Sequence, residues 1–186
     1  VTVLFSDVRG FTTFSEQHSP AEVVATLNEY LGVMTDVIFR WEGTLDKFVG
    51  DEIMVFWGAP MPQPDHAARA LGCALDMRKA LEELHEKWAG EGKPFLEAGI
   101  GINSGAVLVG NIGAQGKKMD YTVIGDHVNL GARVEGLTRK FNRPMLLWPG
   151  VCIVHEAFSD TALRKLKAQH PGAPIAAHPE CPPAII

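Results

Sequence analysis

The sequence has no concentrated basic segment and no long apolar run, and each absence excludes a class of protein. Lysine and arginine total 17 against 22 acidic residues, which gives a net charge of −5, and no Lys/Arg run is present. We therefore expect no nucleic-acid partner. No stretch of the given sequence has the pattern of a signal peptide, and no apolar stretch reaches the roughly 18 residues that a membrane helix needs. The segment itself is not expected to span a membrane.

Cysteine is also scarce, and Cys73, Cys152 and Cys181 show no pairing pattern. This favours a reducing compartment. We expect a cytoplasmic location, either as a free protein or as the cytoplasmic domain of a membrane-bound one. The chain begins inside an apolar strand pattern, so we expect it to be a piece of a longer protein. Its 186 residues, 46% of them hydrophobic, are enough for one domain with a substantial core.

Hydrophobic periodicity and turn residues predict an alternating set of strands and helices. A Ser-Pro pair with Glu22 predicts a helix start at Ser19. The expected elements are a strand at 1–6, helical segments from 20 to 41 with a joint at Gly32, a hairpin of 44–49 and 53–57, a long helix after Asp65, a second hairpin of 95–102 and 106–109, a strand at 121–124, a helix from Asp126 to about Phe141, and a strand at 144–147. Because neighbouring strands form hairpins, this order predicts an α+β fold with helices packed on an antiparallel sheet.

Two carboxylates stand at predicted strand ends. Asp7 ends the first strand, and Asp51 lies at the tip of the Gly50-Asp51 hairpin. If these strands pair, both carboxylates emerge at one edge, where they suit Mg²⁺ or Mn²⁺ together with substrate phosphates. Arg9 and Gly10 follow Asp7, and a glycine turn lets the backbone approach a phosphate closely. The alternative is a solvated turn with a surface ion pair.

Lys47 is the second unusual residue. Strict alternation places it on the same strand face as Leu45 and Val49, in a half-buried space. An ammonium there needs an acceptor, such as a purine ring nitrogen or a buried carboxylate. The alternative is a lysine that extends into solvent from the sheet edge.

Asn129 and Arg133 form the third feature. Their i, i+4 spacing puts them on one face of the last long helix, and that face is otherwise apolar. Arginine can neutralise phosphoryl charge and asparagine can orient a sugar or an attacking oxygen. A capped helix with a surface arginine is the alternative.

Four stretches together resemble one family: LFSDVRGFT, KFVGDEIMVFWGAP, GIGINSGAVLVGNIG and DYTVIGDHVNLGARVE. In order and spacing they are similar to the catalytic domain of class III nucleotidyl cyclases, and to bacterial adenylyl cyclases in particular, over about residues 1–147. The resemblance implies a ferredoxin-like cyclase fold that converts ATP to cyclic AMP and pyrophosphate in intracellular signalling. It also implies two Mg²⁺ or Mn²⁺ ions at each site.

The resemblance implies a role for each motif residue. The metal site would comprise Asp7, Val8 and Asp51, and the substrate would also contact Arg9, Gly10 and Phe11. Lys47 and Thr122 occupy the base-selecting positions. Asn129 would orient the ribose and Arg133 would stabilise charge on the α-phosphate. The family places the metal aspartates on one subunit and the other residues on its partner, which implies a homodimer.

The resemblance ends near residue 147. The family's C-terminal hairpin, with its triphosphate-contacting lysine, is not found, and activity is expected to fall if it is absent. Residues 148–186 instead resemble a fragment of quinolinate synthase, in which the cysteine of HPEC, here Cys181, is an iron–sulfur ligand. We therefore predict a cyclase domain at 1–147 and an unrelated tail at 148–186. The spacing of Cys152, His155, His178 and Cys181 is only loosely typical of a zinc site.

Two other functions fit the sequence. The first is a cyclase-fold module that dimerises or binds nucleotide without turnover. The second is a generic two-metal phosphoryl-transfer enzyme with a palm-like sheet, which leaves Lys47, Thr122, Asn129 and Arg133 without a task. In the full-length protein we expect an upstream sensor or membrane region.

Overall fold

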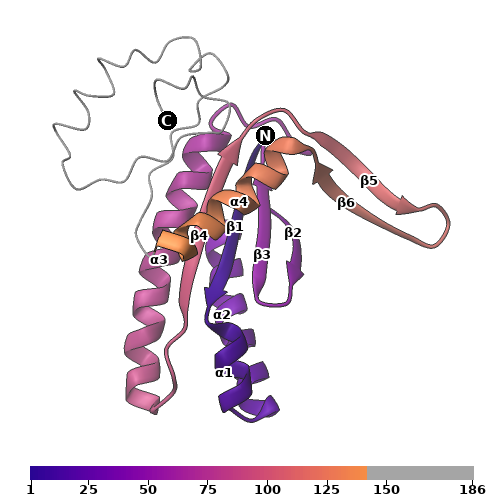
Figure 1. Cartoon of the computed structure of the whole chain (residues 1–186). Coiled ribbons are helices and arrows are strands. Elements are labelled where there is room, and N and C mark those ends of the chain that lie inside the picture. The colour runs from indigo at the N-terminus through magenta and orange to yellow at the C-terminus, as the bar shows by residue number, and fades with distance from the viewer. Residues whose placement is uncertain (142–186) are drawn as a thin grey trace, which may run out of the picture. The chain divides into compact units, whose positions relative to one another are not determined.

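The computed structural model of the chain describes residues 1–141 (Figure 1). The elements in chain order are β1 (Thr2–Arg9), α1 (Phe11–Gln17), α2 (Pro20–Arg40), β2 (Thr44–Val49), β3 (Glu52–Trp57), α3 (His66–Glu91), β4 (Glu97–Ser104), β5 (Leu108–Ala114), β6 (Lys118–Ile124) and α4 (Asp126–Phe141). The strand predicted at 144–147 and the tail at 148–186 lie outside the described residues. No helix within residues 1–141 is both long and apolar enough to cross a membrane.

Four strands form the central sheet in the order β2-β3-β1-β4, and each neighbouring pair is antiparallel. The succession β1-α2-β2-β3-α3-β4 is the ferredoxin-like arrangement. The predicted α+β class is therefore confirmed. Strand β1 is central, because it pairs with β3 on one side and β4 on the other.

Alternation along β1 supplies side chains to two hydrophobic clusters. Leu4 and Val8 join the larger cluster, which is formed with α2 and α3. Val3 and Phe5 point to the opposite face and pack with side chains of β6 and α4. The sheet is thus covered by α2 and α3 on one face and by α4 on the other.

Helix α4 approaches the sheet closely because glycines lie at the contact, both on the sheet and on the helix. A Cβ on Gly101 of β4 would lie 2.7 Å from the Cα of Glu135, and a Cβ on Gly131 of α4 would lie 2.9 Å from Val3. Such distances are below ordinary van der Waals contact, so these positions need glycine. In Figure 1, α4 runs across β1 and β4.

Several predicted boundaries are confirmed and others are wrong. Ser19 caps α2 in a capping box with Glu22, as expected, but α2 continues through Gly32 without a joint. A Cβ on Gly32 would meet no atom within 4 Å, so this glycine occupies an ordinary helical position. Strand β1 extends to Arg9, so Asp7 lies within it. The short helix α1, with Phe14 buried, was not anticipated.

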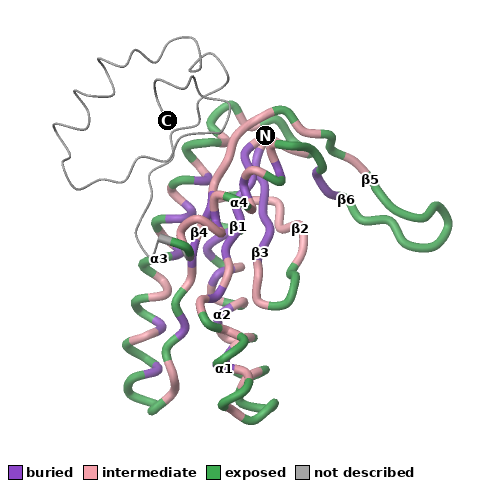
Figure 2. The backbone as a smooth tube through the Cα atoms, in the orientation of Figure 1, coloured by how far each residue is buried: buried purple, intermediate pink, exposed green. Residues whose placement is uncertain are grey.

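The second predicted hairpin is also wrong. Strand β4 pairs with β1, whereas β5 pairs with β6 in a separate two-stranded ribbon. The apolar sequence of β4 is explained by its place in the central sheet rather than by a local turn. The β5–β6 ribbon extends away from that sheet and is exposed over most of its length (Figures 1 and 2).

The glycine contacts under α4 give a stability prediction. Gly101→Ala forces α4 away from β4 and is expected to lower the free energy of unfolding by about 1–3 kcal/mol. Gly32→Ala is the matched control, because its Cβ meets nothing within 4 Å. In a helix this change should raise stability by about 0.5–1 kcal/mol. Urea denaturation measures both, and equal effects would contradict the close packing of α4.

Candidate functional site

The two carboxylates predicted to meet do meet. Pairing of Ser6 with Ile53 aligns the end of β1 with the turn that holds Asp51. The carboxyl groups of Asp7 and Asp51 lie within hydrogen-bonding distance of each other. Gly50, with φ of 65°, makes the two-residue turn that places Asp51 there.

The pKa of Asp51 is raised at this site. Burial is the main cause that raises the pKa of Asp51, and the negative charge of Asp7 raises it further. Burial also raises the pKa of Glu52, with added repulsion from Asp7. The edge of the sheet is therefore an acidic region whose charges repel one another unless a cation lies among them.

The donor set fits a hard divalent cation that keeps positions for substrate. Two carboxylates supply oxygen ligands, which Mg²⁺ and Mn²⁺ prefer. Val8 has a buried apolar side chain, so only its backbone carbonyl could contribute. No group of three His, Cys, Asp or Glu side chains in residues 1–141 is arranged to hold a metal. The pair alone leaves room for phosphate oxygens. The loosely zinc-like Cys and His residues of the tail lie outside the described residues.

The loop after Asp7 has a turn at Gly10 and side chains engaged within the chain. Gly10 adopts φ of 66°, a left-handed conformation that favours glycine, and precedes α1. Phe11 packs on the larger hydrophobic cluster. Arg9 forms an ion pair with Glu135 at 2.8 Å and donates a hydrogen bond to Thr138. The guanidinium of Arg9 therefore binds α4 in this structure. Neither this contact nor the packing of the Phe11 ring supports a direct contact of these side chains with substrate.

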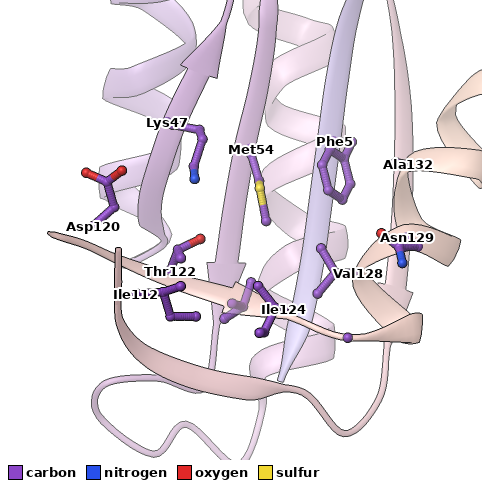
Figure 3. Close-up of a pocket in the computed structure, with 12 residues that line it drawn as sticks. Phe5, Lys47, Met54, Ile112, Asp120, Thr122, Ile124, Val128, Asn129 and Ala132 are labelled. Atoms are coloured by element: carbon purple, nitrogen blue, oxygen red, sulfur yellow. The ribbon is translucent and has the colours of Figure 1, made fainter. Parts of the chain in front are cut away.

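A pocket of about 540 Å³ lies between β2, β3, β6 and α4 (Figure 3). It brings together three of the residues singled out in the sequence: Lys47, Thr122 and Asn129. Phe5 and Met54 form part of its apolar wall, and Asp120 adds a carboxylate that sequence reasoning missed.

A β-bulge determines where Lys47 points. The register between β2 and β3 shifts between Leu45 and Lys47, so that Leu45 pairs with Val55 and Lys47 with Met54. Leu45 packs on the helix α2–α3 side, whereas Lys47 lines the pocket on the other side. The predicted common face for Leu45 and Lys47 is therefore wrong, because the extra residue breaks the alternation.

Asp46 is that extra residue, and it too was missed. Its side chain is fully buried, and its Oδ2 accepts a hydrogen bond of 2.5 Å from the Thr122 hydroxyl. The Lys47 Nζ lies 3.5 Å from its Oδ1. The available signal in the sequence was the pair of adjacent charged residues in an apolar strand, because regular alternation would place only one of them on the solvent side.

On α4, Asn129 and Arg133 lie on the exposed side of the helix rather than on an apolar face. The buried side is formed by residues such as Val128, Gly131 and Glu135. Among the described residues, the side chains of Asn129 and Arg133 have no hydrogen-bond or ion-pair partner. Both polar groups are therefore available to a ligand.

Five of the candidate site residues thus fall into two sets, and Arg133 belongs to neither. Asp7 and Asp51 form the acidic pair, whereas Lys47, Thr122 and Asn129 line a pocket that contains neither aspartate. Between them they offer hard oxygen ligands for a cation and polar groups for a planar, polar ligand.

Similarity to known proteins was found along the chain. The family model described as "Adenylate and Guanylate cyclase catalytic domain" matches residues 1–142. A model described as "Quinolinate synthetase A protein" matches residues 108–186. Adenylate cyclase 1 of Rhizobium meliloti (strain 1021) is 37% identical over 146 residues, which cover 78% of this chain and 22% of that protein. The chain therefore spans less than a quarter of that curated relative.

Two solved structures are also similar. The guanylyl cyclase Cya2 is 50% identical with a TM-score of 0.70, covering 73% of this chain and 68% of that one. The adenylyl cyclase CyaB from P. aeruginosa is 44% identical with a TM-score of 0.69, covering 73% and 70%. With the fold, the family match and the four motifs in agreement, the chain belongs to the family of adenylate and guanylate cyclase catalytic domains.

Proposed function

We propose that this catalytic domain is an adenylyl cyclase that converts ATP to cyclic AMP and pyrophosphate in intracellular signalling. The observation that carries the proposal is the pocket in which Lys47 and Thr122 lie together with Asn129. An ammonium donates to the acceptor N1 of adenine, whereas guanine presents an N–H there. The similar structures include both an adenylyl and a guanylyl cyclase, so base choice is argued from the pocket alone.

The chemistry follows from the two sets of polar groups. The ATP ribose 3′-oxygen attacks the α-phosphorus, and the bond from that phosphorus to the oxygen bridging to the β-phosphate breaks. Asn129 orients the ribose, and Arg133 places positive charge beside the α-phosphate as negative charge develops. Asp7 and Asp51, with the Val8 carbonyl, would hold two Mg²⁺ or Mn²⁺ ions, which would supply positive charge for the phosphates and for ionisation of the 3′-hydroxyl.

A second copy of the chain would complete the site. The acidic pair is not among the residues that line the pocket of its own chain. The β5–β6 ribbon also exposes large apolar side chains: Leu108, Val109, Ile112, Met119, Tyr121 and Ile124. Apolar surface of this kind marks a protein interface. In a homodimer, each copy supplies its pocket to the acidic pair of the other.

The direct test of the function is cyclic AMP formation from ATP with Mn²⁺. ATP binding without product would instead favour the module that does not turn over. Lys47→Glu replaces the donor with an acceptor beside the buried Asp46, and the ratio of ATP to GTP turnover is expected to fall about tenfold or more. An unchanged ratio would remove Lys47 from base selection.

The acidic pair predicts opposite effects of one substitution on stability and on activity. Because the pKa of Asp51 is raised in the fold, its ionisation favours the unfolded chain at neutral pH. Without metal, Asp51→Asn is expected to raise the melting temperature by about 1–2 °C, a small gain because solvent screens the pair. The gain should vanish below pH of about 4, where an aspartate is protonated in both states.

The same variant should lose metal-dependent function. Mg²⁺ is expected to raise the melting temperature of the wild type but not that of Asp51→Asn, and turnover should fall at least about a hundredfold. Glu52→Gln is the control, because it also removes a carboxyl group whose pKa is raised by burial. It should keep the Mg²⁺ response. A normal Mg²⁺ response in Asp51→Asn would refute the metal site.

The exposed ribbon predicts an effect on assembly. Met119 on β6 is 46% exposed, and Met119→Lys would place a charge on this apolar surface in both copies. We expect the dimer to dissociate about tenfold more readily, which corresponds to about 1.4 kcal/mol. Leu71→Lys on α3, where Leu71 is 51% exposed, is the control. Sedimentation velocity measures both, and equal dissociation constants would argue against the ribbon as the interface.

A further inference from the structure

We propose that Asp46 is a positioning residue that sets the purine preference of the pocket by fixing the hydroxyl proton of Thr122. The inference rests on the proposed function and concerns a residue that does not line the pocket itself. It assigns a task to the bulge in β2, which the catalytic proposal leaves unexplained.

The bulge brings two neighbouring side chains to one side of the strand. In a regular strand, Asp46 and Lys47 would point to opposite faces. Here Asp46 reaches Thr122 on β6, 76 residues away, and Lys47 lines the same pocket as Thr122. The two strands that carry the base-selecting residues are therefore joined through the carboxylate of Asp46.

The direction of the hydrogen bond decides what Thr122 can offer to a ligand. A threonine hydroxyl has one proton and two lone pairs, and a carboxylate can only accept. The proton of Thr122 is therefore directed to Asp46 Oδ2, at 2.5 Å. Only lone pairs remain for the pocket, so Thr122 accepts from the 6-amino group of adenine and repels the 6-oxygen of guanine or hypoxanthine.

Asp46 also acts on Lys47. Its Oδ1 is buried, accepts no hydrogen bond from the residues that the structure describes, and lies 3.5 Å from Nζ. A buried carboxylate oxygen without a hydrogen bond is costly and attracts the ammonium. Lys47 is thereby held at the pocket as a donor, next to an acceptor fixed by the same residue. This order of donor and acceptor matches N1 and the 6-amino group of adenine.

A purely structural aspartate is the competing explanation. Removal of such a residue would weaken the fold and reduce turnover of every nucleotide alike. The proposal instead requires a change in the preference between a 6-amino and a 6-oxo purine. Inosine triphosphate is the suitable probe, because its base differs from that of ATP only at positions 1 and 6.

The experiment compares kcat/KM for ATP and inosine triphosphate with Mn²⁺ in the full chain. Asp46→Asn can donate to Thr122 and so release its hydroxyl proton toward the base. We expect the ATP-to-inosine triphosphate ratio to fall about tenfold. In a Thr122→Val background, Asp46→Asn should leave the ratio unchanged, because no hydroxyl remains to be oriented. Asp36→Asn, an exposed position on α2, is the matched control.

The outcomes separate this inference from the proposed function. If the wild type prefers ATP and Asp46→Asn keeps the wild-type ratio, the role of Asp46 is wrong and the adenylyl cyclase stands. If the wild type forms no cyclic nucleotide, the proposed function fails, and dissociation constants for the two nucleotides from calorimetry replace kcat/KM. Binding of neither nucleotide would refute both proposals.

A variant that does not fold still leaves a test. Thr122→Ser keeps the hydroxyl that donates to Asp46, whereas Thr122→Val removes it with little change in volume. The first should keep the ratio and the second should lower it about tenfold. Equal ratios in these two variants would overturn the proposal.

Discussion

Repulsion between two aspartates that the sheet holds together is the constraint on which the site depends. Strand β1 places Asp7 beside the turn between β2 and β3. The carboxyl group of Asp51 in that turn lies within hydrogen-bonding distance of the carboxyl group of Asp7. Without a cation, the fold bears this repulsion, which adds to burial in raising the pKa of Asp51. The pairing of β1 on both edges prevents the strand from moving away to relieve it. The strand that stabilises the core therefore also holds the two carboxyl groups close together.

The sequence predicted those features that depend on local chemistry. The capping box at Ser19 and the Gly50-Asp51 turn each follow from residues a few positions apart, and both are found. The meeting of Asp7 with Asp51 needed only the assumption that two predicted strands pair. The strand pattern singled out Lys47, the helical spacing singled out Asn129, and the resemblance to the cyclase family pointed to Thr122; all three line the pocket.

Features that depend on distant contacts were not predictable in this way. Strand β4 was assigned to a local hairpin because its partner, β1, lies about ninety residues earlier in the chain. Alternation failed at Asp46 because one inserted residue reverses every later side chain, and only the distant Thr122 explains the insertion. The exposed side of α4 was misjudged for a similar reason, since the glycines of β4 determine which side packs.

In the proposed function, base selectivity in this pocket depends on proton direction more than on shape. Adenine and guanine have similar outlines, and their 6-positions differ in whether they donate or accept. A lysine can only donate, but a threonine hydroxyl can do either, so Lys47 and Thr122 alone leave half of the pattern undetermined. A third group must fix the hydroxyl, and it must accept without donating. Asp46, buried and bonded to Thr122, has that property. The proposal therefore makes base preference in this chain depend on Asp46 as well as on the two residues that face the base.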